Sequence, residues 1–262
     1  MCRILYISNP TVDMLVGEGW QRLGVGGPAY YGAWAAQALG CRDIYCLGVI
    51  GRDDAALVVQ GYGSRGVSLV ARVVDGCSTR FRLDYTVRPR RTLLECWPGG
   101  LLPEIVVEIV ESLDPDVVVT SPVYSEVPLG AVRRVSSLAA HHLLDVQGFV
   151  RSAGTRVFEE LAGSAPYIHV SSDDVWGRGP VEILGKRSVV VYTKGTDGVD
   201  LLVEGRWRSY ELPKIVDADP TGSGDVFSTA FIISVYRGLS PEDAVREAIR
   251  VTADFLEEKL GS

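Results

Sequence analysis

Short apolar segments alternate with longer amphipathic segments along most of the chain. Runs rich in valine and isoleucine, such as Val117–Thr120, predict buried β-strands. Segments with apolar residues on one face, such as Pro103–Leu113, predict helices. The predicted strands are Arg3–Ile7, Asp43–Ile50, Val117–Thr120, His142–Val146, Tyr167–Val170 and Val189–Thr193. The predicted helices are Pro28–Leu39, Asp53–Gly61, Pro103–Leu113, Pro128–Ala140, Thr155–Ala162, Ser223–Arg237 and Pro241–Lys259.

A strict alternation of polar and apolar residues marks a different kind of segment between Thr79 and Trp97. Phe81 and Leu83 fall on one side of an extended chain, and Arg82 falls on the other. The alternation stops at residues 88–90, where a proline lies between two arginines, and then resumes. This pattern predicts a two-stranded hairpin with one polar face.

The order of these elements predicts an α/β fold. Strands that alternate with helices require right-handed crossovers, which build a doubly wound, mostly parallel sheet with helices on both faces. A second hairpin, Gly198–Val203 with Trp207–Leu212, is predicted before the last two helices. With 262 residues and no internal repeat or linker, we expect a single domain over residues 1–262.

The charge balance excludes one class of partner. The chain has 33 acidic and 26 basic residues, a formal net charge of −7, so we expect no surface for nucleic acid. No apolar run reaches the roughly 18 residues of a membrane-spanning helix. The N-terminal segment lacks the regions of a signal peptide. We therefore expect a cytoplasmic protein that does not bind membranes.

The five cysteines are odd in number, contain no C-x-x-C pair and stand among apolar neighbours. This distribution predicts buried, reduced thiols and no structural zinc site. The cysteines are Cys2, Cys41, Cys46, Cys77 and Cys96. Asn9 is the only asparagine, and arginine outnumbers lysine 22 to 4. Scarce thermolabile amides favour a thermophilic source, although a biased genome composition would produce the same arginine excess.

A glycine-rich turn before the predicted helix at residues 223–237 carries the strongest chemical signal. Gly222 and Gly224 allow successive backbone N–H groups to point in one direction at the start of a helix, an arrangement that binds phosphate. Asp225 follows directly. A carboxylate in a first turn is commonly a partner of the helix dipole. Behind an anion-binding turn, however, it is also placed to deprotonate a phosphoryl acceptor.

The segment D-P-T-G-S-G-D-V-F at residues 219–227 resembles the D-T-x-G-A-G-D-x-F signature of the ribokinase-like (PfkB) carbohydrate kinases. Asp13 and the Gly26-Gly27 pair before a helix resemble features near the start of the same family. The predicted hairpin lies where the family has its substrate lid. The resemblance covers nearly the whole chain, and it implies a lid formed by about residues 11–25 and 77–97.

The resemblance implies an ATP-dependent phosphotransferase that uses Mg²⁺. Asp225 would be the catalytic base, and Gly222, Ser223 and Gly224 would form the anion hole. The substrate-binding residues would be Asp13, Gly26 and Gly27, with Arg80, Arg82 and Tyr85 as further candidates on the lid. Nucleotide would bind at Thr193, Lys194, Gly195 and Gly198, besides Gly222 and Gly224. Lys194 also fits an ordinary solvated turn.

The metal sites that the resemblance implies are altered in this chain. Asp219 and Thr221 match positions where many members bind a monovalent cation such as K⁺. The family's N-x-x-E motif, which organises Mg²⁺ through water, corresponds to residues 171–174, where Asp174 replaces the glutamate. The chain ends soon after its last predicted helix, so the segment that completes the adenine pocket in longer members is expected to be missing.

A strand-end segment at residues 145–151, D-V-Q-G-F-V-R, brings further polar groups to the expected ligand-binding edge. Asp145, Gln147 and Arg151 are predicted to share one loop, either in contact with the substrate or as a simple surface turn. Together with G-G-P-A-Y-Y at residues 26–31, this string resembles archaeal and plant inositol kinases.

The sequence therefore predicts a kinase of a small polyol or sugar, with a myo-inositol-like acceptor favoured. The alternatives are a nucleoside kinase of the same family and a degenerate protein that binds nucleotide or polyol without transfer. The spacing from Gly24 to Ala29 imitates a dinucleotide fingerprint but begins too far after the first strand. The three histidines have no metal-like spacing, and His169 is expected to be a core residue or a hydrogen-bonded residue without a role in the chemistry. The protein is expected to be a monomer or a dimer paired through its lids.

Overall fold

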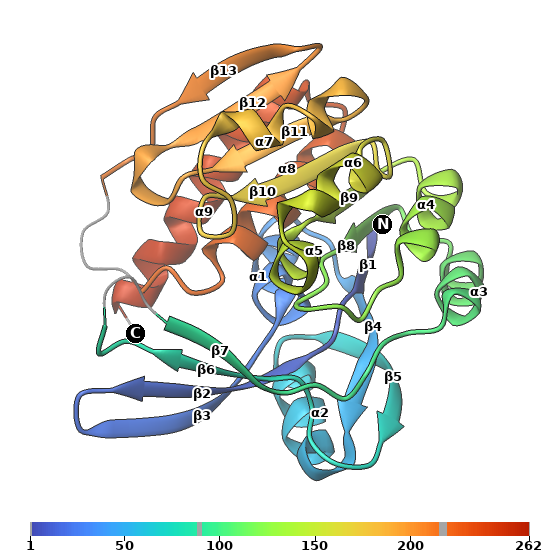
Figure 1. The fold of residues 1–262 in the computed structure, drawn as a ribbon, viewed down its shortest axis with the longest axis vertical. Helices are drawn as coiled ribbons and strands as arrows, with labels where there is room; N and C mark the ends of the chain where they lie inside the picture. The colour runs from blue at the N-terminus through green and yellow to red at the C-terminus, as the bar shows by residue number, and fades with distance from the viewer. Residues whose placement is uncertain (1, 88–90, 215–218, 262) are drawn as a thin grey trace.

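The computed structural model describes residues 2–87, 91–214 and 219–261, which form a nine-stranded sheet and a four-stranded sheet (Figure 1). The large sheet contains β1 (Arg3–Ile7), β4 (Asp43–Gly51), β5 (Val67–Val74), β8 (Val117–Thr120), β9 (His142–Asp145), β10 (Tyr167–Ser171), β11 (Val189–Thr193), β12 (Val199–Val203) and β13 (Arg206–Tyr210). Their spatial order is β13-β12-β11-β10-β9-β8-β1-β4-β5. All neighbours from β11 to β5 are parallel, and the β12–β13 hairpin adds an antiparallel edge.

Helices cover both faces of this sheet, which confirms the predicted α/β class. The helices are α1 (Pro28–Ala38), α2 (Ala55–Ser64), α3 (Pro103–Leu113), α4 (Leu129–Leu138), α5 (Gln147–Ala153), α6 (Phe158–Leu161), α7 (Arg178–Val181), α8 (Ser223–Tyr236) and α9 (Pro241–Gly261). Residues of α1, α2, α8 and α9 share one buried cluster, and residues of α3 to α7 share the other. Along β1, Ile4 and Tyr6 enter the first cluster, whereas Leu5 and Ile7 enter the second. Within the described residues, no helix has the length and apolarity needed to cross a membrane.

The strand order changes direction beside β1, because β4 and β8 lie on its two sides. Ligands of open α/β sheets bind beyond the carboxyl ends of the strands at such a point. The four-stranded sheet lies near this end (Figure 1). Its strands, in spatial order, are β3 (Trp20–Gly26), β2 (Thr11–Gly17), β6 (Arg80–Asp84) and β7 (Arg91–Cys96).

The hairpin predicted between residues 79 and 97 is present as β6 and β7, and the predicted break at residues 88–90 lies outside the described residues. Strands β2, β3 and β5 were not predicted, since residues 11–26 and 67–74 lack a continuous apolar run. The segment after β9 was predicted as a loop and is the helix α5. The backbone N–H of Gln147 donates to Oδ1 of Asp145 at 2.9 Å, so a helix begins directly at the strand end.

The prediction of reduced cysteines is wrong for four of the five. Cys2 pairs with Cys41, and Cys77 pairs with Cys96, with Cα–Cα distances of 4.6 and 6.5 Å. Cys2 precedes β1 and Cys41 precedes β4, and these strands are parallel neighbours, so their starts meet. The second pair joins the two ends of the β6–β7 hairpin. The odd number of cysteines and their spacing could not reveal either disulfide, because both depend on strand pairing within a sheet. Cys46 is the one cysteine that remains a buried thiol.

Candidate active site

The turn between residues 219 and 224 leads into the amino end of α8. Gly222 stands at the position that caps the helix, with φ +84°, a conformation that favours glycine. A β-carbon at Gly222 would overlap the ring of Tyr31 on α1, so the turn also needs glycine for close packing. The N–H of Ser223 donates to the carbonyl of Pro220 at 3.0 Å. The N–H groups of Gly224 and Asp225 are at positions where a helix offers no backbone acceptor.

A buried histidine–aspartate pair lies beside this helix start. Nδ1 of His169, in β10, donates to Oδ2 of Asp145, at the end of β9, over 2.6 Å. Nε2 of the same ring lies 3.1 Å from Oγ1 of Thr193, at the end of β11. The ring of Phe227 stacks on the imidazole at 6.1 Å. Three parallel strands and α8 therefore fix the position of the histidine.

The charges of this cluster act on Asp225. Burial first, and then the Asp145 carboxylate, raise the pKa of Asp225 to about 7, whereas His169 and Arg151 oppose the increase. Burial alone would lower the pKa of His169, but the contact with Asp145 outweighs burial and leaves that pKa above its ordinary value. A carboxylate with a pKa near neutrality is suited to accept a proton, and this one lies in the first turn of a helix, where backbone N–H groups have no helical acceptor.

Arg151 and Asp174 join α5 to the segment after β10. Nε of Arg151 lies 3.3 Å from Oδ1 of Asp174, and its Nη1 donates to the carbonyl of Val123. The guanidinium also lies 5.7 Å from the ring centre of Phe81 on the small sheet. Gln147 contacts Oγ of Ser121 at 3.4 Å. Gln147 and Arg151, predicted as binding residues, therefore lie on the same helix at the carboxyl edge of the sheet.

The small sheet presents one face to this edge. Leu15, Phe81 and Leu83 pack against Val123 and face the large sheet, and Tyr85 continues the same side of β6. The hydroxyl of Tyr85 lies 2.9 Å from Oγ1 of Thr221, so the small sheet touches the turn before α8. We call this side the inner face of the small sheet.

Asp13 lies at the base of the inner face. Its Oδ1 accepts from the N–H of Phe81 at 3.2 Å, and its Oδ2 accepts from Oγ1 of Thr11 at 2.9 Å. A β-carbon at Gly26 would stand 2.8 Å from Oδ2 of Asp13, so glycine keeps the carboxylate accessible from that side. Gly27, at φ +103°, begins α1, and a side chain there would press on the hydroxyl of Tyr62.

Arg80 and Arg82, predicted as candidates for substrate contact, alternate with Phe81 and so lie on the outer side of β6. Nη2 of Arg80 pairs with Asp54 at 2.9 Å, and Nη1 of Arg82 pairs with Glu95 at 4.0 Å. Neither arginine joins the cluster around Asp225.

The four residues near the end of β11 that were predicted to bind nucleotide lie in three different places. Thr193 faces α8 through its contact with His169. Lys194 turns to the opposite face of the sheet, where its Nζ lies 3.0 Å from Oδ1 of Asp200, a carboxylate that Arg178 also binds. Gly195 and Gly198 have positive φ values of +55° and +102° and form the turn between β11 and β12.

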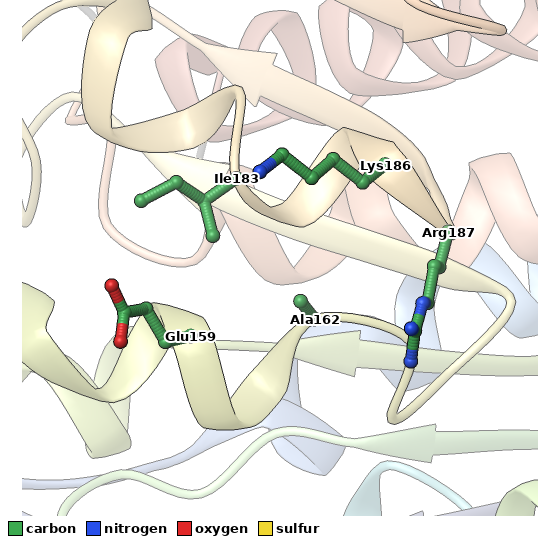
Figure 2. Close-up of a pocket in the computed structure, with 5 residues that line it drawn as sticks. All are labelled: Glu159, Ala162, Ile183, Lys186 and Arg187. Carbon is green, nitrogen blue, oxygen red and sulfur yellow. The ribbon is translucent and has the colours of Figure 1, made fainter.

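Two open pockets lie away from Asp225. One, of about 350 Å³, includes Lys194, Asp200 and the exposed Trp176. The other, of about 360 Å³, lies between α6 and the turn before β11. Figure 2 shows Glu159 and Arg187 on opposite sides of this second pocket, which contains no residue of the cluster described above.

The acidic residues near Asp225 could bind a metal ion only together with ligands that the protein does not supply, such as water and substrate phosphates. No group of three or more His, Cys, Asp or Glu side chains in the described segments could hold an ion. Mg²⁺ commonly keeps several waters and uses one or two carboxylates together with substrate phosphates. Asp174 fits that limited role. Burial raises its pKa to about 6, and Arg151 opposes this shift, so the carboxylate is ionised at neutral pH.

Two site residues escaped the sequence analysis. His169 was expected to be a core residue, because nothing in an apolar strand indicates that a neighbouring strand supplies a carboxylate. Tyr31 was not singled out. Burial raises the pKa of its phenol, and the carboxylates of Asp13, Asp225 and Asp219 raise it further. The ring of Tyr31 lies beside both Gly26 on the small sheet and Gly222 in the turn before α8.

Comparisons with known proteins agree with the fold described above. The model of the pfkB family of carbohydrate kinases matches residues 178–257. Hydroxymethylpyrimidine/phosphomethylpyrimidine kinase of Aquifex aeolicus, strain VF5, is 25% identical over 171 residues, which cover 60% of this chain. The chain spans 61% of the length of that curated relative.

Solved structures show the same fold over almost the entire chain. A pyrophosphate-dependent kinase in the ribokinase family, complexed with a pyrophosphate analogue and myo-inositol, has a TM-score of 0.81 and 19% identity, covering 97% of this chain and 95% of its own. Ribokinase from Thermotoga maritima has a TM-score of 0.73 and 18% identity, with coverages of 97% and 92%. Adenosine kinase from Schistosoma mansoni has a TM-score of 0.77 and 11% identity, with coverages of 97% and 94%.

Proposed function

Because this chain is a ribokinase-like member of the pfkB family of carbohydrate kinases, we propose that it transfers a phosphoryl group to a hydroxyl group of a small polyol or sugar. The position of Asp225 carries this proposal. The carboxylate lies in the first turn of α8, behind the Gly222 turn, and its pKa is near neutrality. A group of that kind is suited to take a proton from an alcohol while the helix start holds an anion.

In the proposed reaction Asp225 accepts the proton of the acceptor hydroxyl as the oxygen attacks the terminal phosphorus of the donor. The bond from this phosphorus to its bridging oxygen breaks, and the rest of the donor leaves with the electron pair (ADP from ATP, or phosphate from pyrophosphate). The N–H groups of Gly224 and Asp225 stabilise the charge on the phosphoryl oxygens. Asp145 holds the imidazole of His169 in place. The positive charge of His169 lowers the pKa of Asp225 and so favours the deprotonated form that acts as the base. The inner face of the small sheet covers the acceptor and excludes water, which would otherwise compete for the phosphoryl group.

ATP is the proposed donor. Mg²⁺, when bound with the donor, neutralises phosphate charge, and Asp174 would hold it through water. Pyrophosphate is the alternative donor, since a pyrophosphate-dependent kinase has this fold. The contact of Thr193 with His169 supports a donor position at the ends of β10 and β11. The pairing of Lys194 with Asp200 does not support a direct contact of Lys194 with the transferred phosphate.

A myo-inositol-like acceptor is favoured. The inner face offers the Asp13 carboxylate and the Tyr85 hydroxyl, and α5 offers Gln147 and Arg151. Hydroxyl-rich, uncharged acceptors suit such a set of hydrogen-bonding groups. The structure of a family member complexed with myo-inositol supports the same class.

A pyrimidine or nucleoside acceptor is the second candidate. The curated relative from Aquifex aeolicus acts on hydroxymethylpyrimidine, and adenosine kinase shares the fold. Phe81 on the inner face could pack against a base as well as against a polyol ring. A protein that only binds these ligands would have little use for a carboxylate at position 225, so we favour an enzyme.

The test is donor consumption measured with a panel of acceptors. Myo-inositol, ribose, fructose, adenosine, cytidine and hydroxymethylpyrimidine are each assayed with ATP and with pyrophosphate in the presence of Mg²⁺. We expect the donor to be consumed only when one particular acceptor is present, and we expect that acceptor to be a polyol or a sugar. Turnover only with a pyrimidine or nucleoside would move the assignment to the second candidate. Donor binding without any acceptor-dependent turnover would contradict the kinase proposal.

The pH dependence follows from the raised pKa of Asp225. A base must be deprotonated, so kcat/KM should be high above pH 7 and fall about tenfold per pH unit below it. Replacing His169 with asparagine keeps a donor toward Asp145 but removes the positive charge that lowers the pKa of Asp225. The acid limb should then move to higher pH. His141→Asn, outside the cluster, serves as the control and should leave the profile unchanged; an unshifted limb in His169→Asn would contradict the electrostatic role.

A further inference from the structure

The side chain of Lys259 crosses from the end of α9 to the turn before α8. Its Nζ lies 3.0 Å from the carbonyl oxygen of Asp219, 3.0 Å from Oδ2 of the same residue and 3.1 Å from the carbonyl oxygen of Thr221. An ammonium group has three donors, and these described oxygens match that number. Two backbone carbonyls and a carboxylate are also the kind of oxygen ligands that hard cations bind.

The helix α9 holds this ammonium in place. Phe255, one turn earlier, is buried, and its ring centre lies 5.4 Å from Nζ of Lys259. The same ring packs edge-on against Trp34 of α1 at 5.3 Å, so the platform under the lysine belongs to the core. Only 26% of the lysine side chain is exposed. The ammonium is therefore fixed by tertiary packing and does not depend on a loose surface contact.

The contacts of Lys259 orient the turn that leads into α8. Oδ1 of Asp219 accepts from both the N–H and the hydroxyl of Thr221, at 3.0 and 2.7 Å, while Oδ2 faces Lys259. In a trans peptide the carbonyl and the next N–H point in opposite directions. Because the Thr221 carbonyl points to Lys259, the N–H of Gly222 points away from it. The ammonium thus sets the direction of a donor at the start of the helix.

The electrostatics of Asp219 agree with a cation at this place. Burial would raise the pKa of Asp219, but the hydrogen bonds from Thr221 and the charge of Lys259 outweigh burial and lower it. The carboxylate is therefore ionised and paired with the ammonium.

The sequence resemblance implies K⁺ at Asp219 and Thr221, and the residues present do not fit that ion. The ammonium of Lys259 already uses both carbonyls and one carboxylate oxygen, and a second positive charge beside it would be repelled. We propose that Lys259 is a positioning residue that supplies, from within the chain, the positive charge that orders the anion-binding turn, so that phosphoryl transfer does not require an added monovalent cation. This inference rests on the proposed function, because it assigns the turn a role in transfer.

The first test compares the wild-type protein in KCl and in tetramethylammonium chloride at equal ionic strength. We expect the same kcat, the same KM for the donor and the same melting temperature in both salts. Activation of the wild-type protein by K⁺ would overturn the inference.

The second test removes the ammonium by Lys259→Met, which keeps an unbranched apolar stem over Phe255. In tetramethylammonium chloride we expect kcat to fall about tenfold or more, as for the loss of one charge-stabilising group. KCl or NH₄Cl should restore most of the loss and raise the melting temperature of the variant. Lys186→Met, at an exposed lysine in the pocket of Figure 2, is the matched control and should show no effect of either salt.

The melting temperatures separate this inference from the proposed function. If no acceptor is turned over but K⁺ stabilises Lys259→Met and not the wild-type protein, the inference on the cation holds and the kinase assignment fails. A variant with full activity, or one whose loss no cation restores, would overturn the inference. If Lys259→Met does not fold, Lys259→Arg, which keeps the charge, should fold and remain independent of K⁺.

Discussion

Replacing Asp225 with asparagine is expected to lower kcat by about 10²- to 10⁴-fold, the usual contribution of a general base. The amide has nearly the same shape but cannot accept the proton of an alcohol. The loss should appear in kcat more than in the KM of either substrate, because the binding groups on α5 and on the small sheet stay in place. Steady-state kinetics with the acceptor found in the panel measure this effect.

The stability of the same variant gives an independent control. Burial disfavours the charged form of Asp225 and raises its pKa to about 7, so a neutral amide removes a cost of folding. We expect the melting temperature above pH 7 to be unchanged or higher. Asp243→Asn is the matched substitution in the first turn of α9, where the carboxylate is exposed. It should leave kcat unchanged. Turnover of Asp225→Asn near that of the wild-type protein would contradict the assignment of the base.

Replacing Gly222 with alanine is expected to lower kcat by roughly 10²-fold, the effect of a lost or misplaced anion-stabilising donor. The new β-carbon would overlap the ring of Tyr31, so either the turn or α1 must shift. A shift of the turn moves the N–H groups at the start of α8 relative to Asp225. The rate of phosphoryl transfer and the affinity for the donor should both fall.

Gly238→Ala distinguishes this packing effect from backbone strain. Gly238 follows α8 with φ +87°, close to the +84° of Gly222, but a β-carbon there meets no atom within 4 Å. Both variants should lose about 1–2 kcal/mol of folding free energy from the positive φ alone. Only Gly222→Ala should lose activity. Equal activity losses in the two variants would contradict the role of the turn before α8.

Much of the large sheet could be predicted because its strands are locally apolar. In a parallel sheet covered on both faces, each strand buries both sides, so the runs at β1, β8 and β11 are continuous in the sequence. Strand β5 escaped prediction because it lies at the edge of the sheet, where most of its residues are only partly buried or exposed. Helix α5 escaped because its seven residues are too few for a helical pattern of apolar positions to repeat.

The candidate site also contains features that a local sequence pattern predicts and features that it does not predict. The glycine turn and the carboxylate of Asp225 could be predicted from the sequence alone, because backbone freedom and a first-turn side chain are properties of a few adjacent residues. The order of the remaining strands and helices could be predicted too, apart from β2, β3, β5, α5 and α7. The contacts of His169 with Asp145 and of Lys259 with the carbonyls before α8 became visible in the folded structure, as did the pairing of four cysteines. These contacts join residues 19 to 40 positions apart, and their energies depend on strand pairing and helix packing that no local pattern contains.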